Sequence, residues 1–272
     1  MEERSSEARA IAEQALVWLL HELRDEPVRP IVLGGLVPPL LTSNSPGHLG
    51  TADVDILLIT HVEAITGLAA VERALDRMEF EPLEEAWRWR GLVGGIPVKV
   101  EFLCDLDEYR EGDVIHPDGC EALGVANLRG TGYVGRDTFE RELSATLRDG
   151  HVVSVVGRFA GLAGYLLSKA AAVRTRAAEK DYYDFAYVLI HNDAGGPEAA
   201  ADRLLHERFD QPRQELRSTF IEVRERFRRT SDTGPVAYAA QSALADPAVD
   251  ELTLRADAVT AVEVFFGRLE DS

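Results

Sequence analysis

Cysteine, long apolar runs and basic residues are all scarce in this sequence, and each scarcity excludes a class of protein. Only Cys104 and Cys120 are cysteines among 272 residues. Two cysteines cannot form the disulfide framework of a small secreted domain or a four-cysteine zinc site. The most apolar stretch near the start, 11–20, is too short to span a bilayer. The charged N-terminus lacks the apolar core of a signal peptide, so we expect a cytoplasmic protein with no membrane partner.

Basic residues number 29 against 47 acidic ones, which gives a formal net charge of −18. A protein that holds nucleic acid through many phosphates usually carries a basic surface. An acidic chain is a more natural partner for cations, metal-bound nucleotides or a basic protein. The best candidate for a local basic patch is the run 213–229, which is rich in arginine. Glutamates interrupt this run, so we interpret it as a solvated helix face, with a nucleic-acid patch as the alternative.

The hydrophobic fraction of 46% suits a globular protein with a substantial core. Apolar residues predict strands at 30–35, 54–59, 79–82, 87–90 and 97–103, and hairpins within 128–156. Helical spacing predicts helices at 7–23, 64–78, 159–176, 181–191, 197–207, 211–229, 236–244 and 254–269. We therefore expect an α+β fold, in which a mixed-sheet lobe with a β-hairpin extension (1–156) is followed by a helical C-terminal lobe (157–272).

Three carboxylates carry the functional hypothesis. Asp53 and Asp55 lie two residues apart in a predicted strand, so their side chains project from the same face. Two such carboxylates repel each other, and a divalent cation removes that cost. Glu101 lies on the polar face of another predicted strand and would complete the site if the two strands are neighbours. Oxygen ligands of this kind favour Mg²⁺, with Mn²⁺ as the alternative.

An Asp-x-Asp segment alone could simply flank a turn. Its surroundings favour a metal site instead. Gly34 and Gly35 end the preceding predicted strand and offer bare backbone amides to a triphosphate, and the hydroxyl of Thr51 can add to them. We therefore predict nucleotide binding next to Asp53 and Asp55.

A second group of charged residues follows in the helical half of the chain. Lys169 lies on a predicted helix and could reach nucleotide phosphates. Lys180, Asp181 and Asp184 follow it, and Asp181 could orient Lys169 or act on an incoming hydroxyl. The alternative is structural: Asp181 as a helix N-cap and Lys180 with Asp184 as a surface ion pair.

Over about residues 30–195 these motifs together resemble the AbiEii/MenT-type nucleotidyltransferases of the polymerase-β-like superfamily. The matching elements are Gly34-Gly35, Gly50-Thr51-x-Asp53-x-Asp55, Glu101, Lys169 and Lys180-Asp181-x-x-Asp184. The resemblance implies that the mixed-sheet lobe is a nucleotidyltransferase lobe that uses an NTP as co-substrate. It also implies that Asp53 and Asp55 bind metal, that Lys169 contacts the nucleotide together with Lys180, and that Asp181 is a catalytic acid.

Toxin members of that family modify the acceptor end of tRNA and are opposed by a partner antitoxin. The resemblance therefore implies a toxin that transfers an NMP to a tRNA 3′ end, with an antitoxin as partner. The net charge favours the alternative acceptor, a cationic small molecule such as an aminoglycoside. Two departures from the family pattern, Leu36 after the double glycine and His48-Leu49 before Gly50, support a third reading: a catalytically inactive nucleotide- or partner-binding module.

Overall fold

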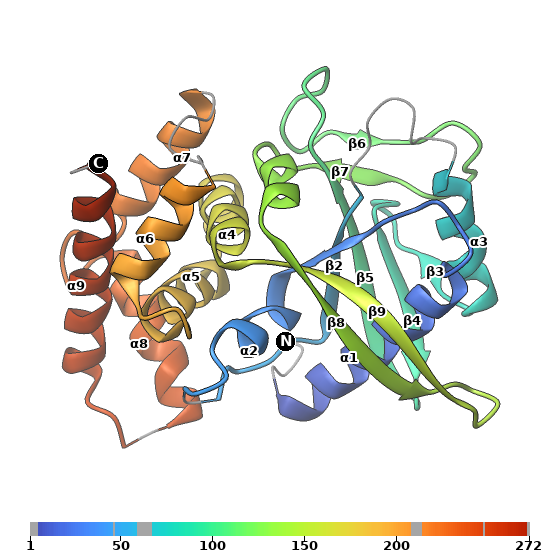
Figure 1. Cartoon of the computed structure of the whole chain (residues 1–272), viewed down its shortest axis with the longest axis horizontal. Helices are drawn as coiled ribbons and strands as arrows, with labels where there is room; N and C mark the ends of the chain where they lie inside the picture. The colour runs from blue at the N-terminus through green and yellow to red at the C-terminus, as the bar shows by residue number, and fades with distance from the viewer. Residues whose placement is uncertain (1–4, 46, 59–66, 208–213, 247, 271–272) are drawn as a thin grey trace. The chain divides into compact units, whose positions relative to one another are not determined.

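The computed structural model describes residues 5–45, 47–58, 67–207, 214–246 and 248–270. The chain divides into two compact units (Figure 1). The first unit contains Met1–Leu36 and Gly50–Ala160, and the second contains Val37–Leu49 and Gly161–Ser272. Segment 37–49, which lies within the predicted first lobe, therefore clusters with the helices of the second unit.

A nine-stranded mixed sheet forms the frame of the first unit in the described part of the chain. Its main path runs β3-β4-β5-β2-β1-β9-β8, and β7 pairs with β5 and β6. The strands are β1 Ile31–Leu33, β2 Asp53–Leu57, β3 Glu81–Pro82, β4 Arg88–Val93, β5 Ile96–Cys104, β6 Val114–Ile115, β7 Val125–Asn127, β8 Thr138–Thr146 and β9 Val152–Ala160. Helices α1 Ser6–Glu22 and α3 Leu68–Arg77, with the 3-10 turns η1 Gly34–Leu36 and η3 Thr131–Arg136, complete the unit.

Helix α1 shows how the sequence pattern produces the packing. It begins where Ser5 accepts a hydrogen bond from the backbone N–H of Ala8 to its Oγ (3.0 Å), as an N-cap does. Its apolar residues then bury one side against the sheet, where α1 contacts β9, β8, β2 and β5. The indole N–H of Trp18 donates to the carbonyl of Thr146 (2.9 Å), which attaches α1 to the end of β8.

Strand β2 lies in the middle of the sheet, antiparallel to β1 and parallel to β5. Val54 and Ile56 are fully buried, whereas Asp53 and Asp55 are partly exposed. The expected alternation of faces is therefore present. The predicted strand extended to Ile59, which lies outside the described residues.

The second unit is helical. It consists of α2 Pro38–Leu41, α4 Leu162–Arg176, α5 Glu179–His191, α6 Pro197–His206, α7 Gln214–Glu225, α8 Thr233–Ala245 and α9 Glu251–Glu270. Helix α5 is its centre and packs against α4, α8 and α9. Phe185 of α5 lies in a cluster of rings with Phe227 and Phe265, all three fully buried.

The structure confirms the α+β class, with a mixed sheet followed by helices. The predicted helix 159–176 begins later than expected, at Leu162, because Phe159 continues β9 and pairs with Val32 of β1. The predicted domain boundary after residue 156 therefore falls inside a strand.

Strand β7 (Val125–Asn127) was not predicted, since three residues carry too little periodicity to be recognised. The predicted start of the helix at 64 lies outside the described residues, and α3 begins at Leu68. Within the described residues, no helix is long and apolar enough to cross a membrane.

Candidate functional site

Backbone pairing places the three predicted carboxylates on neighbouring strands of the first unit. Asp55 of β2 is the Cα partner of Leu33 on one side and of Glu101 on the other. Asp53 is paired in the same way with Lys99. Paired residues of adjacent strands project from the same face of a sheet. Glu101 therefore neighbours Asp55, which meets the condition that the sequence left open.

The two glycines after β1 allow close contacts with β2 and the segment before it. Gly34 has a φ of +64°, and a Cβ placed on it would lie 1.7 Å from Oδ2 of Asp55. A Cβ on Gly35 would lie 2.5 Å from the Cβ of Thr51. Both positions therefore exclude a side chain, and Gly34 also has a backbone conformation that favours glycine. The predicted glycine, threonine and aspartate motifs are together in space.

Thr51 has a local structural contact. Its Oγ1 accepts a hydrogen bond from the backbone N–H of Asp53 (3.1 Å), and the Thr51 side chain is buried. This side chain-to-backbone turn fixes the backbone where β2 begins and so helps to position Asp53. The predicted contact of Thr51 with phosphate stays a prediction.

Glu101 is paired with a cation that the sequence analysis missed. Nε of Arg88, on β4, donates to Oε1 of Glu101 (3.0 Å), and the Glu101 side chain is only 9% exposed. Lys99 adds a second positive charge to this face of the sheet. The alternation of Trp87, Arg88, Trp89 and Arg90 was the signal that could have identified Arg88, because buried Trp89 places both arginines on the opposite face.

The donor set in the first unit fits a cation only in part. Asp53 and Asp55 offer hard oxygen ligands on one face, as Mg²⁺ prefers. Among the described residues, however, no group of three His, Cys, Asp or Glu side chains is arranged to hold a metal ion. The carboxylate of Glu101 is instead hydrogen-bonded to Arg88. Two carboxylates with substrate oxygens can still hold such a cation, since Mg²⁺ is commonly bound by one or two carboxylates plus phosphates.

The second unit contains a buried cluster of charges around Lys169. Its Nζ lies 2.7 Å from Oδ2 of Asp184 and 3.3 Å from Oδ1 of Asp181. Arg176 binds Asp181 through two nitrogens, Nε (2.7 Å) and Nη2 (2.8 Å). The side chains of Asp181 and Asp184 are 0% and 2% exposed. The cluster therefore contains two buried carboxylates and two cations.

The electrostatics of Asp181 follow from these neighbours. Burial, the largest influence, raises the pKa of Asp181, but the charge of Lys169 and the hydrogen bonds and charge of Arg176 outweigh it. The net result is a pKa below the ordinary value of an aspartate, so Asp181 is ionised at neutral pH. Both of its oxygens are engaged and the side chain is fully buried, which suits an orienting role toward Lys169.

The structural alternative for this segment is wrong in its details. Asp181 is not the N-cap of α5, because the cap is Ala178 and Asp181 lies inside the helix. Asp184 is a buried carboxylate that pairs with Lys169, where the alternative expected a surface residue. Lys180 is partly exposed on the same helix, and its predicted contact with nucleotide stays a prediction.

His48, one of the departures from the family pattern, lies within the second unit. Its side chain is 0% exposed, and Nε2 lies 3.0 Å from Oδ1 of Asp184. Nε2 donates to this carboxylate when it carries the ring proton. The ring stacks on Tyr183 and meets Tyr187 edge-on. His48 thus holds its loop to α5 within the second unit.

A second contact anchors the same loop. Asp193 accepts hydrogen bonds from the backbone N–H and hydroxyl of Ser43 (2.9 and 2.7 Å) and from Asn44. These hydrogen bonds, chiefly that of the Ser43 hydroxyl, lower the pKa of Asp193. Together with His48, they explain why segment 37–49 clusters with the helices.

Three arginines of the basic run 213–229 match the solvated-face interpretation. Arg224 pairs with Glu270, Arg228 with Glu225, and Arg229 with Asp232. Each of these arginines therefore has an acidic partner. Arg213 lies outside the described residues.

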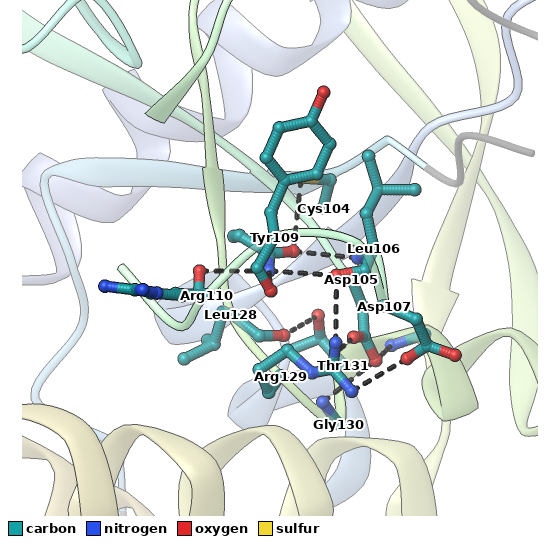
Figure 2. A network of polar contacts seen from close by, with 12 residues as sticks. Cys104, Asp105, Leu106, Asp107, Tyr109, Arg110, Leu128, Arg129, Gly130 and Thr131 are labelled. Atoms are coloured by element: carbon teal, nitrogen blue, oxygen red, sulfur yellow. Dashed lines mark hydrogen bonds and ion pairs between the residues drawn. The ribbon is translucent and has the colours of Figure 1, made fainter. Parts of the chain in front are cut away.

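A further polar network, which the sequence did not predict, follows the end of β5 (Figure 2). Oδ2 of Asp105 accepts hydrogen bonds from the backbone N–H groups of Gly130 (2.9 Å) and Gly132 (3.0 Å). Arg129 lies 3.6 Å from Asp105 and 2.7 Å from Asp107. The amide of Asn127 binds the backbone of Leu106 in both directions. These contacts fix the loops that follow β5 and β7, and so stabilise the strand that carries Glu101.

Comparison with known proteins adds little to this geometry. No protein-family model and no curated protein matches the chain. Its structure is similar to that of an antigenic nucleotidyltransferase-like protein from Paracoccidioides brasiliensis, with a TM-score of 0.39 and 13% sequence identity over 82% of this chain and 90% of that one. A likeness at this level does not establish a shared function.

Proposed function

We propose that this chain is a nucleotidyltransferase that transfers an NMP from an NTP to an acceptor hydroxyl and releases pyrophosphate. The observation that carries the proposal is the close approach between Asp55, in β2, and Gly34, the residue that follows β1. It brings a carboxylate suited to a divalent cation next to backbone N–H groups suited to phosphate. If Asp53 and Asp55 merely flanked a solvated turn, Asp55 would not need a glycine with positive φ, Gly34, packed against its carboxylate.

Within this proposal Asp53 and Asp55 hold Mg²⁺, or Mn²⁺, together with oxygens of the NTP. The cation supplies neutralisation of phosphate charge and polarisation of the α-phosphate. The backbone amides of Gly34 and Gly35 and the hydroxyl of Thr51 bind the outer phosphates. Glu101, once released from Arg88, accepts the proton of the acceptor hydroxyl.

We further propose that Lys169 and Lys180, which both belong to the second unit, contact the nucleotide. Asp181 acts through Lys169: its buried, ionised carboxylate fixes the ammonium group in one direction. We therefore assign Asp181 as a positioning residue in place of a catalytic acid.

For the acceptor we propose the 3′ end of tRNA first, in a toxin opposed by an antitoxin protein. The motif resemblance supports this choice. The net charge of −18 and the acidic partners of Arg224, Arg228 and Arg229 support the alternative, an aminoglycoside-like cation.

A test incubates the purified chain with each labelled NTP, Mg²⁺, and either total tRNA or a panel of aminoglycosides. Label transfer to one acceptor class, lost in Asp53→Ala and in Asp55→Ala, is the expected result. Circular dichroism on both variants controls for folding. Activity that survives both substitutions would show that the metal site is misassigned.

The second candidate is a nucleotide- or partner-binding module that does not catalyse. The Arg88–Glu101 ion pair favours it, because that pair neutralises the third carboxylate without a metal. Nucleotide binding without transfer to any acceptor, in folded protein, would select this candidate.

A further inference from the structure

The first unit contains a cavity of about 530 Å³ that none of the predicted motifs uses. It lies between the end of α1, the loop before β1 and the β8–β9 hairpin. Arg158, in its wall, pairs with Ile31, the first residue of β1. Asp55 pairs with Leu33, the last residue of that strand. The cavity is therefore at the opposite end of β1 from the glycines and the carboxylates.

Positive charge dominates the lining of this cavity. Arg24, Arg29 and Arg158 contribute three guanidinium groups, against one carboxylate, that of Glu140, which is the cross-strand partner of Arg158. This sign is the reverse of the whole chain, which carries −18. A concave site with one sign of charge concentrates ligands of the opposite sign.

Two of the guanidinium groups are held in place by hydrogen bonds to uncharged acceptors. Arg29 donates through Nη1 to the carbonyls of Glu26 (2.7 Å) and Val28 (3.0 Å). Arg158 donates through Nε to Oγ1 of Thr138 (2.9 Å) and through Nη2 to the carbonyl of Gly135 (3.2 Å). All four acceptors are uncharged. Within the described residues, neither arginine forms an ion pair with a carboxylate.

The remaining cation, Arg24, lies 3.3 Å from Asp25, and both side chains are largely exposed. Exposed pairs of this kind contribute little and are easily exchanged. Arg29 and Arg158 therefore carry the argument. A guanidinium that is already oriented loses less freedom when it binds an anion, and its fork of N–H groups matches phosphate oxygens.

The wall between these cations is apolar. Leu20, Leu23, Val28 and Val155 line the cavity together with the charged groups. A bare inorganic ion would leave this surface unused, whereas a ligand with a ring next to its charge would cover it.

We propose that this cavity binds an organic phosphate, with the phosphate on Arg29 and Arg158 and a base or sugar ring on the apolar wall. This site is independent of the transferase reaction proposed above. The chemistry is shared by a free mononucleotide and by a nucleotide of a single strand, and the two sources are separated by experiment.

The test titrates the full chain with AMP by calorimetry at low salt in EDTA, where binding that depends on a divalent cation is suppressed. We expect AMP to bind, and adenosine, which lacks the phosphate, to bind on the order of tenfold more weakly or not at all. Arg29→Gln should weaken AMP binding by roughly tenfold, as loss of one charge-assisted contact does. Arg158→Gln should do the same. Arg29 is exposed, and its printed hydrogen bonds go to backbone carbonyls only. Arg29→Gln therefore tests the proposal even if Arg158→Gln unfolds.

Arg228→Gln is the matched control, since Arg228 is an exposed arginine with its own carboxylate partner, Glu225. Its affinity for AMP should equal that of the wild type. A short RNA oligonucleotide, titrated in parallel, identifies the source: tighter binding than AMP indicates a strand, and equal binding a free mononucleotide. Absence of AMP binding, or AMP binding that neither Arg29→Gln nor Arg158→Gln weakens, would overturn the proposal.

Discussion

The carboxylate of Asp55 lies where a side chain on Gly34 would be: a Cβ at Gly34 would come within 1.7 Å of Oδ2 of Asp55. The two residues belong to adjoining segments of the antiparallel pair β1–β2, in which Leu33 is the partner of Asp55. The glycine after β1 and the aspartate in β2 therefore constrain each other. A side chain introduced at Gly34 should therefore displace the carboxylate of Asp55.

Gly34→Ala should destabilise the protein for two reasons. Its φ of +64° is strained for alanine, at a cost of about 1–2 kcal/mol. The methyl group would also displace the Asp55 carboxylate. We expect urea unfolding at lower denaturant and, under the proposed function, transfer activity reduced at least as far as in Asp55→Ala.

Gly94→Ala is the matched control. Gly94 has a similar φ of +59°, but nothing lies within 4 Å of a Cβ placed there. Gly94→Ala should lose about as much stability from backbone strain as Gly34→Ala does, and it should keep its activity. Equal activity in both variants would contradict the view that Gly34 serves the site through Asp55.

Local pattern was enough to predict the elements that position the carboxylates. The alternation of Val54 and Ile56 with the aspartates defines a strand with one buried face. The pairing of Glu101 with Asp55 was a hypothesis at that level, because a sequence does not state which strands are neighbours. The structure shows that β2 and β5 are neighbours and that their register pairs Asp55 with Glu101.

The charge pairings could not be predicted in this way. His48 and Asp184 are 136 residues apart in sequence, and only the fold brings them to 3.0 Å. The Arg88–Glu101 pair depends on the register of β4 with β5. A helical pattern at Asp181 is compatible with a cap or an interior position, and the choice depends on where the chain turns before it.

Lys169→Met should be strongly destabilising. The substitution removes the ammonium group between Asp181 and Asp184 and leaves buried carboxylates with less compensation, a change that typically costs about 3–5 kcal/mol. Urea unfolding at pH 7 measures it. Adding Asp184→Asn to Lys169→Met should recover part of the loss, because it removes one of the excess charges. A double variant no more stable than Lys169→Met would contradict the cluster as described.

Asp181→Asn should change how stability depends on pH. The pKa of Asp181 is lower in the folded protein than in the unfolded chain, so the folded state favours the ionised form. The stability from this group is thus fully present above the unfolded pKa of about 3.9 and is lost as pH falls through the folded pKa. The urea midpoint of the wild type should therefore fall in acid more steeply than that of Asp181→Asn. Parallel profiles for the two proteins would show that Asp181 has no such shift.

Arg88→Gln tests whether Glu101 can serve a cation. The substitution removes the hydrogen bond from Nε of Arg88 to Glu101 and one positive charge from the face that carries Asp53 and Asp55. If Glu101 is the third ligand, Mn²⁺ should bind this variant several-fold more tightly than the wild type, as measured by electron paramagnetic resonance of free Mn²⁺. Arg90→Gln is the control for charge alone, because Arg90 lies on the same face of β4 but is paired with Lys99. The gain should disappear in Arg88→Gln combined with Glu101→Gln, since the neutral amide is a poorer ligand for a hard cation. An affinity for Mn²⁺ that Arg88→Gln leaves unchanged would assign Glu101 to the structural ion pair and restrict the metal ligands to Asp53 and Asp55.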